Sequence, residues 1–395
     1  MTSYIKSHFE NMLHGKKVVI ASSASISLYR IPDLIRDIKR EGADVISGLS
    51  SSAAEMLNPE IFKWASGHEV VTKISGYIEH ISLFDENTIL LIAPASYNTI
   101  GKMANGIADN IPSLLFSYAH GHKNSVVVVP AMHKDMMNSD INKENIKKLE
   151  DIGVLIADPE YDETKAKLAE NDKIIDYICR SVYGHRLENK NIFIVAGKSE
   201  LNIDPVRVLS NRSTGYTGYW LARNAFRYGA KLITYIGNSE YDIPSYVNYV
   251  NRVNLKDIII EINSFLGTDH YDYIIMPIAL MDFELEESME KLKSSSEQVI
   301  TLKPGSKVRD RIRGMAQDSK MVLFSLESEN EYDSQKFKNS EPDLVVLNSI
   351  NDKTFGENTK DYVFIHKDNK THFKNIDKAQ LSIEIYNYLI DEISG

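Results

Sequence analysis

Residues 203–215 combine a proline turn, charges of both signs, an amide and a run of hydroxyl groups that ends in a glycine. Pro205 fixes its own backbone angle and favours an extended conformation for Asp204 before it. Residues 213–215 come directly before an apolar pattern of helical period, and the free N–H groups at the start of a helix attract anions. The alternative is an ordinary strand-to-helix connection capped by Ser or Asn. The length and order of the motif favour an anion site that suits a phosphate.

The elements that must position this motif follow from the hydrophobic pattern. Short runs rich in Val and Ile alternate with longer segments of helical period, first from Lys17 and again from Asn191. Continuous apolar strands separated by crossover helices predict parallel sheets covered on both faces, with ligands outside the carboxyl ends of the strands. A charged and polar stretch divides the two alternations near residue 188. The sequence therefore predicts an α/β protein of two doubly wound parallel-sheet domains, residues 1–188 and 189–395.

The composition excludes several classes of function. The 395 residues carry a net charge of −10, which argues against a nucleic-acid-binding surface because such surfaces need concentrated Lys and Arg. No segment approaches about 18 uncharged apolar residues and the amino end lacks an apolar signal core, so we expect a cytoplasmic protein without a membrane partner. The single cysteine, Cys179, excludes an internal disulfide framework and a multi-cysteine metal site.

The motif over residues 204–215 resembles D-P-V-R-x-[IL]-[ST]-N-x-S-[ST]-G, which marks the ligase half of the bifunctional phosphopantothenoylcysteine synthetase/decarboxylase family of coenzyme A biosynthesis. The resemblance extends from about Lys17 to Ile393. It implies a flavodoxin-like flavin domain followed by a Rossmann-like ligase domain. It also implies that the carboxylate of 4′-phosphopantothenate attacks CTP in the presence of Mg²⁺ to give an acyl-cytidylate, from which cysteine forms the amide.

The resemblance implies roles for residues of the second domain. Asn211 matches the asparagine of the acyl-cytidylate step, and Arg207 matches a guanidinium suited to gripping an anion. Asp282 ends a buried strand and matches the contact to the nucleotide or metal, although an acid there can also be a turn cap. Lys291 matches the first lysine of an E-K-[IL]-K loop, although a lysine pair is more often a solvated face. The other implied nucleotide contacts are Lys293, Phe324, Lys336 and Lys338.

We expect the side chains of Arg207, Asn211 and Lys291 to converge on one cavity. The segments at residues 197–200 and 303–307 depart from the family's pattern, which alters the loop facing the base of the nucleotide. The sequence therefore leaves both CTP and ATP open as the nucleotide.

Two loops of the first domain, residues 93–98 and 130–133, place small and polar residues at the carboxyl ends of expected strands. Taken alone, the first of them can simply end a buried strand. Residues 24–30, 51–54, 93–98 and 104–110 together resemble the segments that hold flavin mononucleotide (FMN) in a family of homo-oligomeric cysteine decarboxylases. The implied contacts in the flavin domain are Ser23, Ser25, Ser51, Ser96, Asn98 and His133.

His80 matches the histidine of the family's H-I-x-L motif, whose implied role is proton acceptor in decarboxylation. A lone histidine before an apolar pair is more often a surface or satisfied residue. In the family's chemistry the flavin oxidises the substrate's thiol, after which the carboxylate leaves as carbon dioxide. His133 replaces an asparagine of the family, and residues 158–163 replace the loop that carries its catalytic cysteine. We therefore expect FMN binding without efficient decarboxylation.

The sequence leaves three functional alternatives. The first choice is one fused enzyme of coenzyme A biosynthesis. The second is a ligase whose flavin domain serves as an oligomerisation scaffold, and the third is a flavin-binding regulatory protein without turnover. The family also implies a homo-oligomer, with flavin domains in trimers or multiples of trimers and ligase domains in dimers.

Overall fold

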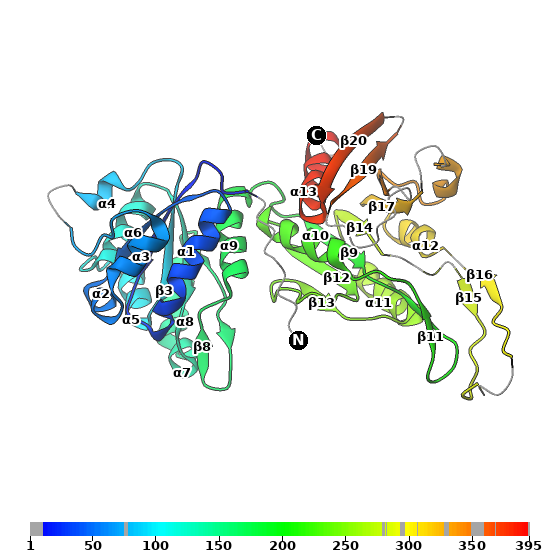
Figure 1. The fold of residues 1–395 in the computed structure, drawn as a ribbon, viewed down its shortest axis with the longest axis horizontal. Helices are drawn as coiled ribbons and strands as arrows, with labels where there is room; N and C mark the ends of the chain where they lie inside the picture. The colour runs from blue at the N-terminus through cyan, green and yellow to red at the C-terminus, as the bar shows by residue number, and fades with distance from the viewer. Residues whose placement is uncertain are drawn as a thin grey trace. The chain divides into compact units, whose positions relative to one another are not determined.

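The structure is a computed structural model that describes residues 11–74, 78–278, 281, 283–292, 297–305, 307–327, 332–348, 359–367 and 369–393. The chain forms two compact units, Met1–Gly184 and His185–Gly395 (Figure 1). This boundary lies close to residue 188, where the sequence predicts it. Among the helices of the described segments, none has the length and apolarity that crossing a membrane requires.

The first unit is built on a five-stranded parallel sheet in the order β2-β1-β3-β4-β6. This is the flavodoxin-like order, in which the winding of the chain reverses between β1 and β3. Every residue of β3 is buried, because helices cover both faces of the sheet. The strands are β1 (Lys17–Ser22), β2 (Asp44–Leu49), β3 (Thr88–Ala95), β4 (Ser125–Pro130) and β6 (Leu155–Ile156).

Helices pack on both faces of this sheet. On one face, α5, α6 and α8 pack through the buried side chains of Ile100, Leu115 and Leu149, respectively. On the other face, α1 contacts α9 and buries Leu34 and Ile38 at helical spacing. The helices are η1 (Ile26–Arg30), α1 (Ile31–Arg40), α2 (Ser51–Met56), α3 (Pro59–Ser66), α4 (Glu79–Ser82), α5 (Tyr97–Ala104), α6 (Ile111–Gly121), α7 (Lys134–Asn138), α8 (Asp140–Asp151) and α9 (Asn171–Tyr183).

The second unit is built on an eight-stranded sheet in the order β13-β12-β9-β14-β17-β18-β19-β20. Its first six strands are parallel and follow the Rossmann order 3-2-1-4-5-6, and two antiparallel strands extend it at one edge. The two doubly wound α/β domains predicted from the sequence are therefore confirmed. The strands are β9 (Asn191–Ala196), β12 (Leu232–Gly237), β13 (Asn248–Val250), β14 (Tyr273–Met276), β17 (Lys320–Leu326), β18 (Leu344–Asn348), β19 (Thr359–His366) and β20 (Asn369–Asp377).

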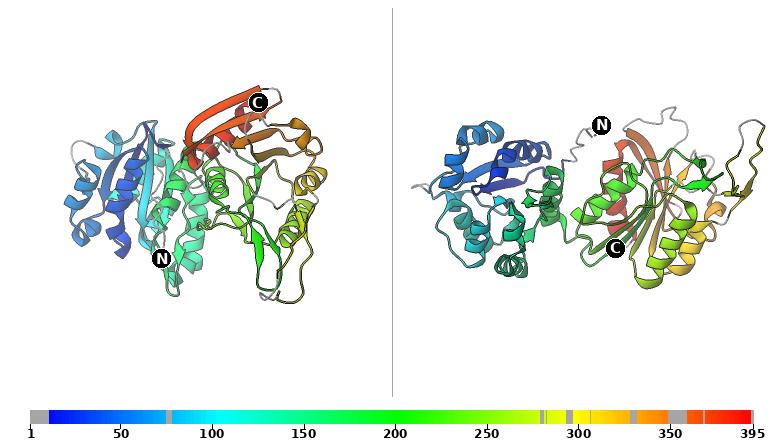
Figure 2. Two further views of the ribbon diagram at one scale, coloured as in Figure 1. Left: turned by 45° about the vertical axis from the view of Figure 1, so that its right-hand side comes forward. Right: turned by 90° about the horizontal axis from the view of Figure 1, so that it is seen from below.

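Helices also sandwich the second sheet (Figure 2). On one face Ile258 of α11 and Ile312 of α12 join the core around Phe193. On the other face α10 packs on α13, where Asn224 Nδ2 donates to Ser382 Oγ at 2.5 Å. The helices are α10 (Tyr216–Arg227), α11 (Leu255–Thr268), α12 (Val308–Met315), η3 (Ser334–Phe337), α13 (Lys378–Tyr388) and η4 (Leu389–Ile393).

Three small antiparallel sheets complete the fold. In the first unit, β5 (Met132–His133), β7 (Glu160–Tyr161) and β8 (Lys165–Lys167) pair in the order β5-β8-β7. In the second unit, β10 (Glu200–Asn202) pairs with β11 (Val208–Ser210), and β15 (Phe283–Leu285) pairs with β16 (Leu302–Pro304). Figure 1 shows that these last two hairpins project from the second unit on the same side.

Candidate functional site

The carboxyl ends of β1 and β3 lie side by side where the winding of the first sheet reverses, which is where open α/β sheets bind ligands. The hydroxyl of Ser23 donates to the carbonyl oxygen of Pro94 at 2.7 Å and accepts the N–H of Ser96 at 2.9 Å. Ser23 is buried. Its hydroxyl therefore fastens the loop after β1 to the loop after β3 and shapes this edge of the sheet.

Four more predicted flavin contacts surround this edge. Ser25 and Ser96 are the N-caps of η1 and α5, and each accepts a backbone N–H of the first turn at 3.4 Å. Ser51 and Asn98 are exposed in the first turns of α2 and α5. Because β2, β1 and β3 are neighbours at a spacing of about 4.8 Å, the loops that carry these side chains follow three adjacent strands at one edge.

Two large side chains next to this edge are open to solvent. Ile26 is 79% exposed and Tyr29 is 67% exposed, and both belong to η1 directly after β1. Exposed apolar surface beside hydroxyl and N–H groups matches a ligand that has an aromatic ring system and a phosphorylated tail. The residues at this edge therefore fit FMN.

His133 lies at the same edge, after β4, in the small sheet β5-β8-β7. It pairs with Lys165 across the ladder, and its Nδ1 lies 3.7 Å from a carboxylate oxygen of Asp135. Half of the side chain is exposed. An imidazole N–H in this position can donate to an anionic ligand at the carboxyl end of β4.

Residues 158–163, which replace the cysteine loop, form β7 and the turn that leads to β8. Asp162 closes this turn by accepting the N–H groups of Thr164 and Lys165 at 2.9 and 2.7 Å. Its ion pair with Lys167, together with these two hydrogen bonds, lowers the pKa of Asp162 to about 2. The hairpin offers charged groups but no thiol, since Cys179 is buried on α9.

His80 lies toward the opposite edge of the same sheet. It belongs to α4, which leads to Leu83, and the carbonyl oxygen of Leu83 accepts Lys17 Nζ at the amino end of β1. The imidazole stands edge-on to Tyr118 in the second half of α6, with 6.0 Å between ring centroids. The eight residues of β3, about 23 Å of strand, separate this edge from Ser96 (Figure 1). The structure therefore does not bring His80 to the other predicted flavin contacts of its own chain.

In the second unit, α10 begins where the carboxyl ends of β9 and β12 meet. Gly215 has a φ of +80°, and a Cβ added to it would lie 2.4 Å from the carbonyl oxygen of Asn238. A Cβ added to Gly218 would lie 2.3 Å from the Cβ atom of Ala196, at the end of β9. Only glycine permits this close approach. The sequence therefore sets the first turn of α10 directly against the ligand-binding edge of the sheet.

Asn211 lies just before this helix, at the end of the β10/β11 hairpin. Its Oδ1 accepts the N–H of Ser213 at 3.0 Å, which orients the side chain toward the residues that start α10. The neighbouring hydroxyl of Ser210 donates to the carbonyl oxygen of Ser199 at 3.2 Å, so this end of the hairpin is tied to the loop after β9.

Arg207 lies at the far end of the same hairpin and is exposed. Its guanidinium pairs with Asp204 and donates to the carbonyl oxygen of Leu292 at 3.2 Å. Lys291, which is also exposed, therefore lies next to a residue that Arg207 contacts. Asn211 is four residues further along an extended segment, about 13 Å from Arg207 between Cα atoms. Arg207 thus contacts the residue that follows Lys291, and Asn211 occupies the other end of the hairpin.

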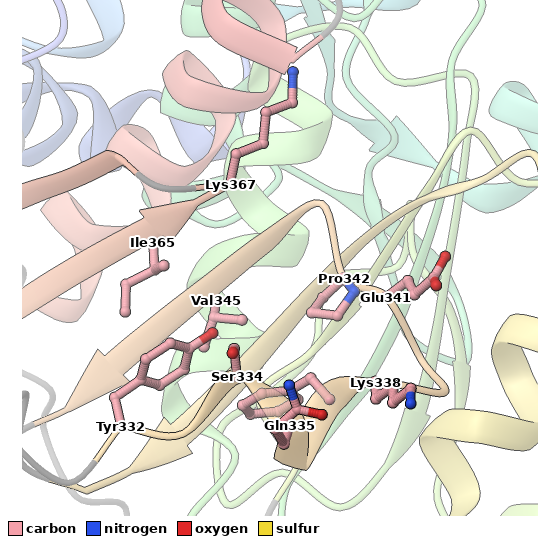
Figure 3. A pocket seen from close by; sticks show the side chains of 10 residues that line it. Tyr332, Ser334, Gln335, Lys338, Glu341, Pro342, Val345, Ile365 and Lys367 are labelled. Carbon is pink, nitrogen blue, oxygen red and sulfur yellow. The ribbon is translucent and has the colours of Figure 1, made fainter.

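The lysines assigned to the nucleotide point to different places. Lys336 Nζ donates to Ser325 Oγ at 3.2 Å and to Glu327 Oε1 at 3.0 Å, which places its ammonium group at the carboxyl end of β17. Phe324 is part of β17 and is half-buried. Lys338 instead lines a cavity of about 360 Å³ with Tyr332, Ser334, Gln335, Phe337, Glu341, Pro342, Val345, Ile365 and Lys367 (Figure 3). None of Arg207, Asn211 and Lys291 lines this cavity.

Two predicted site residues, Asp282 and Lys293, lie outside the described residues. Within the described ranges, no group of three or more His, Cys, Asp or Glu side chains is placed to hold a metal ion. The assignment of Asp282 to Mg²⁺ therefore stays a prediction.

Sequence reasoning missed Ser199 and gave Asp204 no chemical role. Ser199 is fully buried, and its hydroxyl accepts the N–H of Met281 at 2.9 Å, which ties the loop after β9 to the loop after β14. No local signal distinguishes this serine from a surface residue. For Asp204, the sequence feature that indicates a structural role is its position as the first residue of the Asp-Pro-Val-Arg turn.

The comparison with known proteins covers both units. Residues 6–183 match the Flavoprotein family, and residues 187–393 match the DNA/pantothenate metabolism flavoprotein C-terminal domain. A coenzyme A biosynthesis bifunctional protein from Thermococcus kodakarensis is 32% identical over 387 residues, which is 95% of each chain. A protein with the same description from Methanocaldococcus jannaschii is 30% identical over 399 residues, covering 100% of this chain and 93% of the other.

One solved structure, the C-terminal domain of a coenzyme A biosynthesis bifunctional protein, is 22% identical to this chain. It covers 53% of this chain and 98% of its own, with a TM-score of 0.45. The full-length matches decide the family. The chain belongs to the coenzyme A biosynthesis bifunctional proteins, enzymes in which a flavoprotein domain precedes the DNA/pantothenate metabolism flavoprotein C-terminal domain.

Proposed function

We propose that the second unit is a phosphopantothenate–cysteine ligase that uses CTP. A carboxylate oxygen of 4′-phosphopantothenate attacks the α-phosphorus of CTP, and the bond to the β-phosphate breaks to release pyrophosphate. The amine of cysteine then attacks the carbonyl carbon of the acyl-cytidylate, loses a proton and expels CMP. Both steps place negative charge on phosphoryl oxygens, which cationic side chains and Mg²⁺ stabilise.

One contact carries this proposal: the guanidinium of Arg207 donates to the carbonyl oxygen of Leu292, 85 residues further along the chain. Two exposed cations, Arg207 and Lys291, thereby reach one region from distant segments. We assign them to the phosphate and carboxylate groups of the reactants, because a guanidinium can bind such anions with two parallel hydrogen bonds. Asn211, beside the start of α10, is assigned to the acyl-cytidylate.

The remaining nucleotide contacts are proposed from the resemblance to the family. Asp282 is assigned to Mg²⁺ and the nucleotide, and Lys293, Phe324, Lys336 and Lys338 are assigned to the nucleotide. Lys336 is favoured by its place at the carboxyl end of β17. ATP is the alternative to CTP, because residues 197–200 and 303–307 depart from the family's pattern.

We further propose that the first unit holds FMN at the carboxyl edge of its sheet. The hydroxyls of Ser25, Ser51 and Ser96 and the amide of Asn98 contact it there, while Ser23 fixes the two loops in place. When bound, FMN supplies the oxidation of a thiol. His133 binds the substrate carboxylate. Decarboxylation is slow in this proposal, because the hairpin of residues 158–167 provides no thiol to supply a proton.

An isotope-traced assay with purified protein tests both halves at once. With labelled 4′-phosphopantothenate, labelled cysteine, Mg²⁺ and either CTP or ATP, we expect pyrophosphate formation and the ligated conjugate, and faster turnover with CTP. Almost no labelled carbon dioxide is expected from the conjugate. Rapid carbon dioxide release would refute the proposal of slow decarboxylation. Failure to form pyrophosphate with either nucleotide would refute the ligase and favour a flavin-binding regulatory protein.

We also propose that the protein is a homo-oligomer in which His80 of one copy lies beside the FMN held by another copy and acts there as the proton acceptor. His80 lies on the far edge of the sheet from Ser96, and its Nδ1 is buried without a hydrogen-bond partner in the described part of the chain. Val206, Met289 and Val299 on the two hairpins of the second unit are 66%, 89% and 86% exposed, which is a large apolar area to leave in water. A second copy would cover such surfaces.

Size-exclusion chromatography with light scattering, read at the absorbance of FMN, tests this assembly. We expect FMN to elute with an oligomer, and a dilute monomeric fraction to be colourless, because the monomer lacks one side of the flavin site. A monomer that retains one FMN per chain would contradict the shared site.

A further inference from the structure

Asp204 is a buried carboxylate whose acceptor positions are all occupied. It is 2% exposed. Its Oδ1 accepts the N–H groups of Val206 and Arg207, both at 2.8 Å. Its Oδ2 accepts a hydrogen bond from the guanidinium of Arg207. The same oxygen accepts the N–H of Leu292 at 3.1 Å. A carboxylate offers about four acceptor positions, so this side chain is fully used.

These contacts belong to a wider attachment between the β10/β11 hairpin and residues 287–292. The N–H of Ser288 donates to the carbonyl oxygen of Ile203 at 3.0 Å, and Asn202 Nδ2 donates to Glu287 Oε1 at 3.1 Å. At the other end of the segment, Leu292 is held through its N–H by Asp204 and through its carbonyl oxygen by Arg207. The backbone on both sides of Lys291 is therefore fixed to the hairpin.

We propose that Asp204 is a positioning residue of the ligase, which holds Arg207 and the segment carrying Lys291 in one arrangement. This inference rests on the proposed ligase function, in which Arg207 and Lys291 contact the reactants. Asp204 itself contacts neither reactant. It acts by fixing the positions of two segments, joined by a contact between residues 85 positions apart, that carry the two cations.

The charge of Asp204 suits this role. Burial raises the pKa of its carboxyl, but the N–H groups of Val206, Leu292 and Arg207 and the guanidinium outweigh burial and hold the pKa at about 2. The carboxyl group is therefore ionised at neutral pH. Three of these contacts come from backbone N–H groups, so Asp204 keeps the backbone of Arg207 and Leu292 in place while the guanidinium contacts an anionic reactant.

Asp162 in the first unit provides a matched control. It closes its hairpin in the same way, by accepting two backbone N–H groups and pairing with a cation, Lys167. The carboxylate of Asp162 binds Thr164, Lys165 and Lys167 within its own hairpin, whereas that of Asp204 reaches Leu292, 88 residues away. Substituting the two aspartates therefore separates the loss of a turn from the loss of the long-range attachment.

Hydrogen exchange in the full-length protein without ligands tests the attachment. In D204A and D204N, we expect the amides of residues 288–292 to exchange at least about tenfold faster than in the wild type, because hydrogen bonds to a buried charge are lost. In D162A and D162N the exchange of this segment should be unchanged. Unchanged exchange in both Asp204 variants would overturn the inference, whatever the activity of the protein.

A double-mutant cycle tests the effect on the reaction. D204N should lower kcat/KM for pyrophosphate formation at least about tenfold, and in a K291A background the same substitution should cost at least about threefold less, because only the positioning of Arg207 is then lost. D162N should leave ligation unchanged. Additive effects of D204N and K291A would show a general structural role and overturn the inference. A wild type without ligation would refute the proposed function alone, because the exchange measurement still decides whether Asp204 holds the segment.

Discussion

Replacing Lys291 with Ala should lower kcat/KM for nucleotide-dependent pyrophosphate formation by about 10²–10³-fold and leave the melting temperature unchanged. In the proposed reaction its ammonium group stabilises charge that develops on the phosphoryl oxygens, and removing one such group from a preorganised site has effects of this size. The side chain is exposed, so the fold does not depend on it. Steady-state kinetics with thermal unfolding of the same samples measures both quantities.

Lys231 is a suitable control for this substitution. It is exposed directly before β12, at the edge of the sheet opposite to the ligand-binding edge. K231A removes the same charge from the same unit and should retain at least about half of the activity. If K291A stayed within about threefold of the wild type, Lys291 would have no role in catalysis, and the assignment of the reacting region beside Leu292 would fall with it.

Replacing Gly215 with Ala should destabilise the second unit by about 2–4 kcal/mol and reduce ligation by about 10²-fold. The new Cβ would lie 2.4 Å from the carbonyl oxygen of Asn238 in a residue with a φ of +80°. Backbone strain and overpacking each cost about 1–3 kcal/mol. Relief requires the first turn of α10 to move away from the strand ends, and misplacement of about 1 Å near a reacting group has a large effect on rate.

Urea unfolding and ligation kinetics at a temperature below the transition measure these effects. Gly267 in α11 is the control, because a Cβ added there would meet nothing within 4 Å. G267A should stabilise the protein by about 0.4–1 kcal/mol by restricting the unfolded chain, and it should not alter ligation. A G215A protein with the stability and activity of the wild type would contradict the role of this turn.

Local sequence patterns were sufficient for the architecture. The apolar runs of β3 and β4 predicted buried parallel strands, because such strands are covered on both faces and lose the alternation of a half-exposed strand. The same patterns did not show that β19 and β20 extend the second sheet with antiparallel strands. An apolar run indicates that a strand is buried, but it does not indicate whether the neighbouring strand is parallel or antiparallel.

The candidate sites were predictable to different degrees. Ser25, Ser51, Ser96, Asn98 and His133 follow strands of one parallel sheet, and the carboxyl ends of parallel strands meet at one edge, so their gathering follows from the fold class. His80 follows no strand of the sheet directly, and its position depends on the path of the chain between β2 and β3. That path takes it to the opposite edge, which no local pattern indicates.

The sequence by itself determined the two α/β domains, the family and the turn chemistry of residues 203–215, because these depend on hydrophobic period, backbone preference and residue order within short segments. The tertiary structure alone decided which distant groups meet: Asp204 with Leu292, and Ser23 with Pro94. Contacts of this kind depend on strand order and loop paths across many residues. Residue types within a short window cannot specify them, since each polar group has many partners of equal chemistry along the chain.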